Sequence, residues 1–194
     1  MTRSRKARYM AKSDVDISSA LVVDLAEEEL IQVLHVDDEP SLLKAAKQIL
    51  EMQGNFRVET ALSVEEAMEK MKQEPYDVIV CDYEMPERDG LDFLRELRHS
   101  GNTIPFIIFT GKGREEVAVE ALNLGADGYF KKFGGAEAVC SELAHGIRQV
   151  VERKEAEKKL RESKKKFRNS YESIPDARAI MLKGFEVQDF VGRI

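Results

Sequence analysis

The chain has 194 residues, of which 43% are hydrophobic and 34% charged, and its net charge of −6 argues against a nucleic-acid-binding protein. This length suits one ordinary domain with extensions, and no apolar run is long enough to span a bilayer. The two cysteines, Cys81 and Cys140, argue against a disulfide framework or a zinc site and indicate a reducing, cytoplasmic setting.

The N-terminal residues show no hydrophobic periodicity. They are first basic, then rich in Ser and Asp, then acidic. No apolar stretch follows the basic residues, so they do not form a secretory signal. We expect residues 1–29 to be a mobile leader, because the sequence changes character only at about residue 30.

From residue 30 onward, short apolar runs alternate with helical patterns. The runs that we expect to be strands are 31–36, 56–61, 77–81, 104–109 and 129–130. Most are continuously apolar, which is typical of strands in a sheet that is covered on both faces. Strands and helices that alternate at this spacing predict a doubly wound parallel α/β sheet with right-handed crossovers.

The segments between these runs carry helix start and stop signals. Ser63, with Glu66 three residues later, has the pattern of a capping box. Gly54 and Gly125 are typical residues at which a helix ends. We expect five helices, the last of which begins near Ala136.

The last helix continues past the point where a compact domain would end. Residues 151–168 hold nine Lys and Arg and four Glu, a local charge of +5, with a sparse apolar stripe. We expect an exposed helical linker that is a candidate coiled coil. The domain itself is expected to span residues 30–150. The final segment, 169–194, is too short to bury a core of its own.

Polar and charged side chains follow the carboxyl ends of the predicted strands. Asp37 and Asp38 follow the first strand, Asp82 the third, Thr110 the fourth and Lys132 the fifth. In open α/β sheets, ligands bind outside these strand ends, so the five side chains should share one rim. Each could be only a turn or cap residue by itself, and it is their combination that points to a site.

This set of side chains suits phosphoryl transfer. Three neighbouring carboxylates repel one another unless a cation lies among them, and hard oxygen ligands suit Mg²⁺. A carboxylate such as that of Asp82 can attack phosphorus and form an acyl phosphate. A metal and Lys132 can neutralise the phosphoryl oxygens, and the Thr110 hydroxyl can hydrogen-bond one of them.

Four motifs occur in order along the chain: Val36-Asp-Asp-Glu-Pro40, Asp82-Tyr-Glu-Met-Pro86 with Asp89-Gly90, Phe109-Thr-Gly111, and Gly125-Ala-Asp with Tyr129 and Lys132. This arrangement resembles the response-regulator receiver family of two-component signalling over about residues 30–150. Each motif is weak alone, but all of them in order are specific. The resemblance implies a flavodoxin-like sheet with strand order 2-1-3-4-5.

By this resemblance, a partner histidine kinase would phosphorylate Asp82. Asp38 and Asp82 would bind Mg²⁺ directly, the backbone carbonyl of Glu84 would be a third ligand, and Asp37 would assist, partly through water. The domain would be a phosphoacceptor rather than an enzyme, with weak self-dephosphorylation at most.

Three further residues would respond to the phosphoryl group in the same way as in the family. Lys132 would pair with it, Thr110 would swing to bond it, and Tyr129 would move inward. The signal would then reach a downstream protein through a changed surface near the fourth helix, the fifth strand and the fifth helix.

One position departs from the family pattern. The family usually has Pro after the Lys, often in a cis peptide, whereas Phe133 and two glycines follow here. Lys131 competes with Lys132, but strand alternation points Lys131 away. Phe133 keeps open a non-phosphorylated pseudo-receiver scaffold. A metal-dependent phosphatase fits less well, because such enzymes usually have a second Asp where this chain has Glu84.

The C-terminal region resembles the start of another signalling module. Arg161-Glu-Ser-Lys-Lys-Lys-Phe-Arg168 with Tyr171-Glu-Ser-Ile-Pro-Asp176 is similar to the linker and opening helix that lead into PAS sensory domains. Residues 169–194 would then be a truncated PAS start or a disordered tail. We see no DNA-reading element, and so expect no direct nucleic-acid partner. The C-terminal helix is a candidate homodimer contact.

Overall fold

The computed structural model describes residues 30–111 and 115–172, with side chains up to residue 168. The predicted leader (1–29) and the C-terminal segment beyond residue 172 lie outside the described residues. The described helices and strands are β1 (Ile31–Val36), α2 (Pro40–Met52), β2 (Phe56–Ala61), α3 (Val64–Gln73), β3 (Val78–Cys81), α4 (Gly90–His99), β4 (Phe106–Thr110), α5 (Glu115–Asn123), β5 (Gly128–Lys131) and α6 (Ala136–Glu172).

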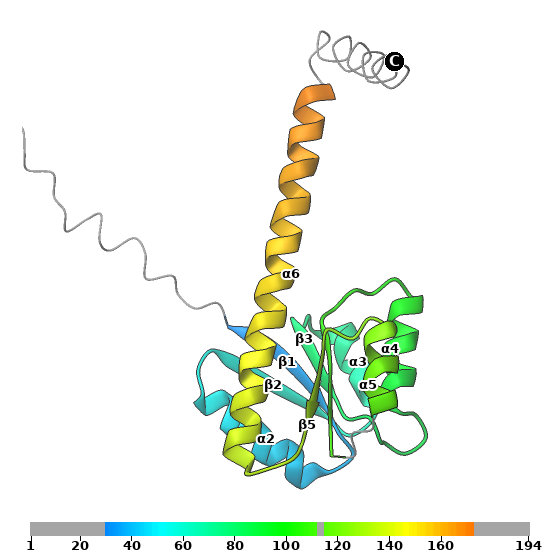
Figure 1. Cartoon of the computed structure of the whole chain (residues 1–194), viewed down its shortest axis with the longest axis vertical. Coiled ribbons are helices and arrows are strands. Elements are labelled where there is room, and N and C mark those ends of the chain that lie inside the picture. Colours follow the sequence, from blue (N-terminus) through cyan, green and yellow to red (C-terminus); the bar gives the residue numbers. More distant parts are fainter. Residues whose placement is uncertain (1–29, 112–114, 173–194) are drawn as a thin grey trace, which may run out of the picture. The chain divides into compact units, whose positions relative to one another are not determined.

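The five strands form one parallel sheet in the order β2-β1-β3-β4-β5. α2 and α6 cover one face of the sheet, and α3, α4 and α5 cover the other (Figure 1). The predicted doubly wound α/β class and strand order are therefore confirmed. Within the described chain, no helix combines the length and the hydrophobicity needed to cross a bilayer.

Each face of the sheet has its own hydrophobic core. Successive side chains of a strand point to opposite faces, so Val33 of β1 packs under α2 and α6 while Leu34 packs under α3 to α5. The Phe93 and Phe106 rings meet edge to face in the second core, with their centroids 5.6 Å apart. Burial of each large apolar side chain contributes about 1.5–3 kcal/mol, which holds both helical layers to the sheet.

The ends of two helices are capped by side chains. The Ser63 hydroxyl accepts a hydrogen bond from the Glu66 N–H at 3.2 Å, as the capping-box pattern predicts. The Glu66 carboxylate accepts from the Leu62 N–H at 2.8 Å, one residue before the cap, so the reciprocal bond is displaced by one position. Asp89 caps α4 by accepting from the Asp92 N–H at 2.8 Å.

The strand boundaries near the end of the sheet differ slightly from those predicted. β4 begins at Phe106 rather than at residue 104. The Ile104 N–H donates to the Asn102 side chain and Pro105 has no N–H, so neither residue donates to the sheet ladder. Thr110, expected just after the strand, is its last residue.

α6 packs against the sheet and then continues beyond it. Its inner face includes the fully buried Leu143 and Ile147, and Val151 is the last buried residue among those whose side chains are described. A Cβ atom at Gly146 would lie 2.2 Å from the Phe130 ring, so this glycine lets α6 approach β5. The predicted long helix is confirmed, whereas its role as a coiled coil stays a prediction.

Candidate functional site

Three aspartates lie together at the carboxyl ends of β1 and β3. Val36 pairs with Cys81 in the parallel register, so the residues that follow these two positions are neighbours. The Asp82 N–H donates to the Val36 carbonyl at 2.9 Å. Asp37 is 1% exposed and Asp82 8% exposed, whereas Asp38 is exposed. One carboxylate oxygen from each of the three lies within 4.8 Å of the others.

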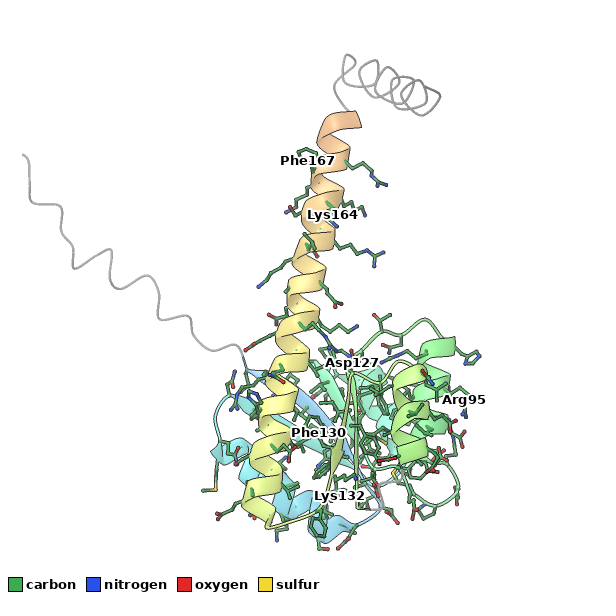
Figure 2. The ribbon with its side chains drawn as sticks, in the orientation of Figure 1. Arg95, Asp127, Phe130, Lys132, Lys164 and Phe167 are labelled. Atoms are coloured by element: carbon green, nitrogen blue, oxygen red, sulfur yellow. The ribbon has the colours of Figure 1, made fainter. Side chains whose placement is uncertain are left out.

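Lys132 reaches this group from the end of β5. Its N–H donates to the Thr110 carbonyl at 2.8 Å, which carries the β4–β5 pairing one residue past the strand. Its ammonium nitrogen lies 3.3 Å from Oδ2 of Asp82 and also contacts Oδ2 of Asp37. Figure 2 shows Lys132 at the end of the sheet opposite Asp127. Lys131 is exposed, as strand alternation predicts.

The electrostatics of the site favour an additional cation. Burial raises the pKa of Asp82, the Lys132 ammonium lowers it, and the Asp37 charge raises it again. The Tyr83 N–H donates to Oδ1 of Asp82 at 2.8 Å. The single ammonium group of Lys132 therefore contacts two buried carboxylates, those of Asp37 and Asp82, and the carboxylate of Asp38 lies close to both. The clustered oxygen donors fit a hard divalent cation held between Asp37, Asp38 and Asp82.

Thr110 ends β4, and Tyr129 lies in β5, the strand that leads to Lys132. Thr110 is 1% exposed at the end of β4. Burial raises the pKa of Tyr129, and so does the negative charge of Asp82, which places the phenol within the electrostatic reach of that carboxylate. The Tyr129 hydroxyl is buried and has no hydrogen-bond partner among the described residues. Glu84 lies two residues after Asp82 in the loop before α4, with an exposed side chain.

Gly90 and Phe109 are neighbours of the site whose contacts the sequence analysis did not predict. A Cβ atom at Gly90 would lie 2.2 Å from the Asp82 carbonyl oxygen, so only glycine lets α4 begin so close to that residue. The Phe109 ring lies 5.5 Å from the Lys132 ammonium, measured to the ring centroid. The period of two in β4 could have predicted that Phe109 and Thr110 face opposite sides of the sheet.

His35 is a core residue, as expected from its position inside the first strand. It is fully buried, its ring centroid lies 5.9 Å from that of Phe109, and neither ring nitrogen has a hydrogen-bond partner in the described structure. Burial, assisted by the positive charge of Lys132, lowers the pKa of His35 to about 3. The imidazole is therefore neutral near pH 7.

The loop after Lys132 has Phe133 at the position where the resemblance would place a proline. Phe133 is 90% exposed, and it follows Lys132 through a trans peptide bond. Of the two glycines that follow, Gly134 has a positive φ of 126°, which favours glycine. The loop thus turns at Gly134 without the ring of a proline.

Comparisons with known proteins point to one family. A family model described as the response regulator receiver domain matches residues 33–144. The response regulator SaeR of Staphylococcus aureus is 36% identical over 103 residues, which make up 53% of this chain and 44% of that protein. The chain therefore spans less than half the length of the curated relatives that it matches.

Solved structures of receiver domains are similar as well. A response regulator receiver domain protein from Clostridium thermocellum superposes with a TM-score of 0.59 at 32% identity, over 66% of this chain and 98% of that chain. The response regulator domain of Thermotoga maritima CheB superposes with a TM-score of 0.58 at 30% identity, over 64% and 98%. Sequence and fold thus agree on the same class of domain.

Proposed function

Because the chain belongs to the response regulator receiver domain family, we propose that it accepts a phosphoryl group on Asp82 from a sensor histidine kinase, in a Mg²⁺-dependent reaction. The observation that carries this proposal is the grouping of Asp82 with Lys132 and two more carboxylates. Asp37 and Asp82 are both buried and both contact the ammonium group, and we choose Asp82 because the resemblance of its motif to the family assigns the phosphoryl group to that position. Receiver domains are signalling domains that pair with histidine kinases.

The proposed reaction transfers a phosphoryl group to a carboxylate oxygen. The ionised Asp82 attacks phosphorus, a new O–P bond forms, and the bond between phosphorus and the donor nitrogen breaks with its electron pair on that nitrogen. Oδ1 of Asp82 is held by the Tyr83 N–H, while Oδ2 faces Lys132. We therefore assign Oδ2 as the attacking atom and Lys132 as the group that pairs with a phosphoryl oxygen.

Asp37, Asp38, Asp82 and the Glu84 carbonyl would hold the metal ion. When bound, Mg²⁺ supplies neutralisation of the phosphoryl charge. Asp37 is oriented by the Glu39 N–H, which donates to its Oδ1 at 3.0 Å. This bond leaves the other oxygen of Asp37 for Lys132.

Thr110 and Tyr129 are the proposed sensors of the phosphoryl group. The Thr110 carbonyl accepts a hydrogen bond from the Lys132 N–H, so the two residues are neighbours at the end of the sheet, which supports the proposed role of the Thr110 hydroxyl. In the described part of the chain, the buried Tyr129 hydroxyl has no hydrogen-bond partner, and burial and the Asp82 charge raise its pKa, which supports a response of Tyr129 when the charge at Asp82 changes. A downstream protein would then read the altered surface.

The test is phosphorylation by a small donor. The 194-residue chain is incubated with acetyl phosphate, with and without Mg²⁺, and its intact mass is measured. We expect a gain of about 80 Da that requires Mg²⁺ and is absent in Asp82→Asn. The matched control is Asp92→Asn, which removes an exposed carboxylate of α4 that pairs with Arg95 and should leave the gain unchanged.

Phe133 favours a second candidate, a pseudo-receiver that binds a partner without phosphorylation. Its 90% exposed ring is an unusual feature beside the candidate site. The same mass measurement separates the two functions. Absence of the gain under conditions that phosphorylate another receiver domain would favour the scaffold. Slow loss of the gain after donor removal would reveal the proposed self-dephosphorylation.

The domain boundaries and the role of the C-terminal helix also remain proposals. We propose a receiver at residues 30–150 and an output linker at 151–168 that acts on a downstream protein or on a second copy of the chain. The local charge of +5 opposes close pairing of two such helices at low salt. The proposed start of a PAS module in residues 169–194 concerns side chains outside the described part.

A further inference from the structure

A largely shielded carboxylate, that of Asp127, lies at the end of the sheet opposite the candidate site. Asp127 directly precedes β5, and its side chain is 9% exposed. Its N–H donates to the Phe106 carbonyl at 2.7 Å, and its Oδ2 accepts from the Phe106 N–H at 3.1 Å. Asp127 is therefore fixed to the beginning of β4 as well as that of β5.

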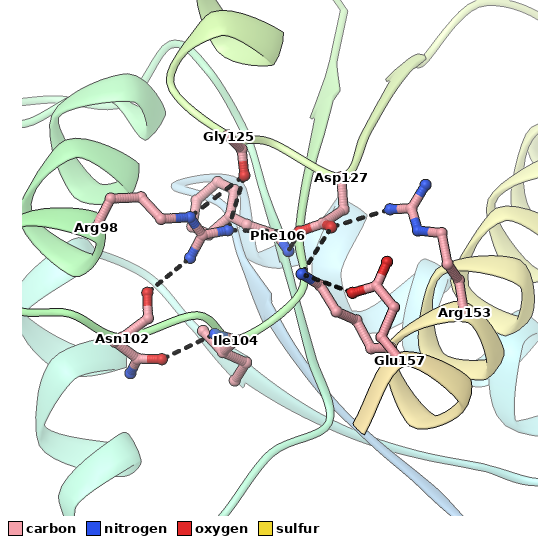
Figure 3. Close-up of polar contacts among 9 residues, drawn as sticks. Arg98, Asn102, Ile104, Phe106, Gly125, Asp127, Arg153 and Glu157 are labelled. Carbon is pink, nitrogen blue, oxygen red and sulfur yellow. Dashed lines mark hydrogen bonds and ion pairs between the residues drawn. The ribbon is translucent and has the colours of Figure 1, made fainter. Parts of the chain in front are cut away.

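Arg98 of α4 supports this carboxylate from one side. Its guanidinium lies 3.4 Å from Oδ2 of Asp127 and donates to the Gly125 carbonyl at 2.9 Å and to the Asn102 carbonyl at 3.0 Å (Figure 3). The Arg98 side chain is 21% exposed. These several bonds join α4 firmly to the loop that precedes β5.

α6 reaches the other oxygen of the same carboxylate. Arg153 donates to Oδ1 of Asp127 at 2.9 Å (Figure 3), and the Lys154 ammonium lies 3.6 Å from that oxygen. Arg153 and Lys154 lie two and three residues after Val151, the last buried residue of α6 among those whose side chains are described. They are also the first two cations of the basic linker. The contact thus lies where α6 leaves the core.

The two halves of this contact differ in strength. The half made with Arg98 and Phe106 is largely shielded from water and contains several hydrogen bonds. The half made with Arg153 is open, because the Arg153 side chain is 52% exposed, and exposed ion pairs contribute little. The linker can therefore separate from Asp127 at small cost while the carboxylate stays satisfied by Arg98 and Phe106.

We propose that Asp127 is a positioning residue for signal output, holding the base of the linker helix to the sheet through Arg153 and Lys154 and releasing it when the strands shift. β4 and β5 begin at this contact; β4 ends at Thr110, and β5 ends at Lys131, one residue before Lys132. A movement of Thr110 or Lys132 at the phosphoacceptor end can therefore reach the base of the linker through β4 and β5. The inference rests on the proposed function, since the movement requires phosphorylation of Asp82.

The first test measures hydrogen exchange of the full chain with the Arg153→Gln/Lys154→Gln variant. Both substitutions lie on the linker side of the contact, so the Asp127 carboxylate and the core residues are unchanged. We expect backbone amides of residues 152–160 to exchange about threefold to tenfold faster than in the wild type, with β3 unchanged. The matched control is Lys164→Gln/Lys165→Gln, which removes the same charge further along the same helix and should not accelerate exchange at residues 152–160. Equal exchange rates at residues 152–160 in the two variants would contradict the proposal that Arg153 and Lys154 hold the base of the linker to Asp127.

The second test adds acetyl phosphate and Mg²⁺ to each protein, with the extent of phosphorylation read by intact mass. Phosphorylated wild type should change its exchange at residues 152–160, and the Arg153→Gln/Lys154→Gln variant should not, at equal phosphorylation. A purely structural contact would not produce this difference. The same change in exchange in the wild type and in the Arg153→Gln/Lys154→Gln variant would contradict the proposal that phosphorylation acts on the linker through this contact. If the wild type gains no mass, the proposed function is wrong, and so is the proposed release of the linker by phosphorylation. The first test would still decide whether Arg153 and Lys154 hold the base of the linker to Asp127.

Discussion

The ammonium nitrogen of Lys132 lies 3.3 Å from Oδ2 of Asp82 and at the same time contacts Oδ2 of Asp37. One positive charge is thus shared by two carboxylates that are almost completely buried. Such an arrangement leaves excess negative charge in a region where charge is costly. The site is therefore electrostatically prepared for a further cation, and four expected outcomes follow from this and neighbouring contacts.

Replacement of Lys132 by Met should impair phosphorylation. The Lys132 charge lowers the pKa of Asp82, so its removal should raise that pKa further. Loss of a group that stabilises transferring phosphoryl oxygens costs on the order of a hundredfold in rate. The measurement is the rate of mass gain with acetyl phosphate across pH, and the matched control is Lys131→Met at the exposed neighbouring position. An unchanged rate and pH profile in Lys132→Met would contradict the assigned role.

Mg²⁺ should stabilise the protein through the three aspartates. The raised pKa of Asp82 means that its ionised form is disfavoured in the folded state, and a bound cation relieves this. At ten times the dissociation constant, binding contributes about 1.4 kcal/mol, which corresponds to roughly 3–6 °C in Tm. Differential scanning fluorimetry should detect the shift in wild type and in Asp92→Asn. It should be lost in Asp38→Asn and Asp82→Asn, and a full shift in both would exclude this metal site.

His35 should make the protein sensitive to acid. Its pKa is lowered to about 3 in the folded state, from about 6.5 in an unfolded chain. The unfolded chain therefore binds more protons between these values, and stability should fall as pH drops from about 6.5 toward 3, by up to about 1.4 kcal/mol per pH unit. Denaturant unfolding of His35→Leu should show a shallower decline, whereas the exposed His99→Gln should match wild type. Parallel declines in all three proteins would assign the acid sensitivity to other groups.

Gly90 should tolerate no side chain. A Cβ atom there would lie 2.2 Å from the Asp82 carbonyl oxygen, which is backbone and cannot rotate away. We expect Gly90→Ala to lower the free energy of unfolding by about 1–3 kcal/mol and to slow phosphorylation by displacing Asp82. At Gly135 a Cβ atom meets nothing within 4 Å, so Gly135→Ala is the control in urea unfolding. Equal stability of the two variants would show that α4 can move away from Asp82.

Much of the site could be anticipated from the sequence because of one geometric property of parallel sheets. Residues that follow the strands all emerge at the same edge, so Asp37, Asp82 and Lys132 had to approach one another once the strands were recognised. The strand ends were less predictable. Pro105 and the side-chain bond to Ile104 delay the start of β4, an effect of local hydrogen bonding that periodicity does not report.

Other features depended on tertiary packing. Asp37 and Asp38 are adjacent and chemically identical, yet only the fold decides that Asp37 is buried against Lys132 while Asp38 stays exposed. The contact between Asp127 and Arg153 joins residues 26 positions apart, and no local pattern marks either as a partner.

By itself, the sequence determined the alternation of strands and helices, the edge at which the polar residues emerge, and the continuation of the last helix past the sheet, since these follow from local periodicity and chain order. Only the tertiary structure decided which carboxylates lose their water, which cation they share, and where α6 is tied to the sheet. Burial and ion pairing depend on side chains brought together from distant parts of the chain.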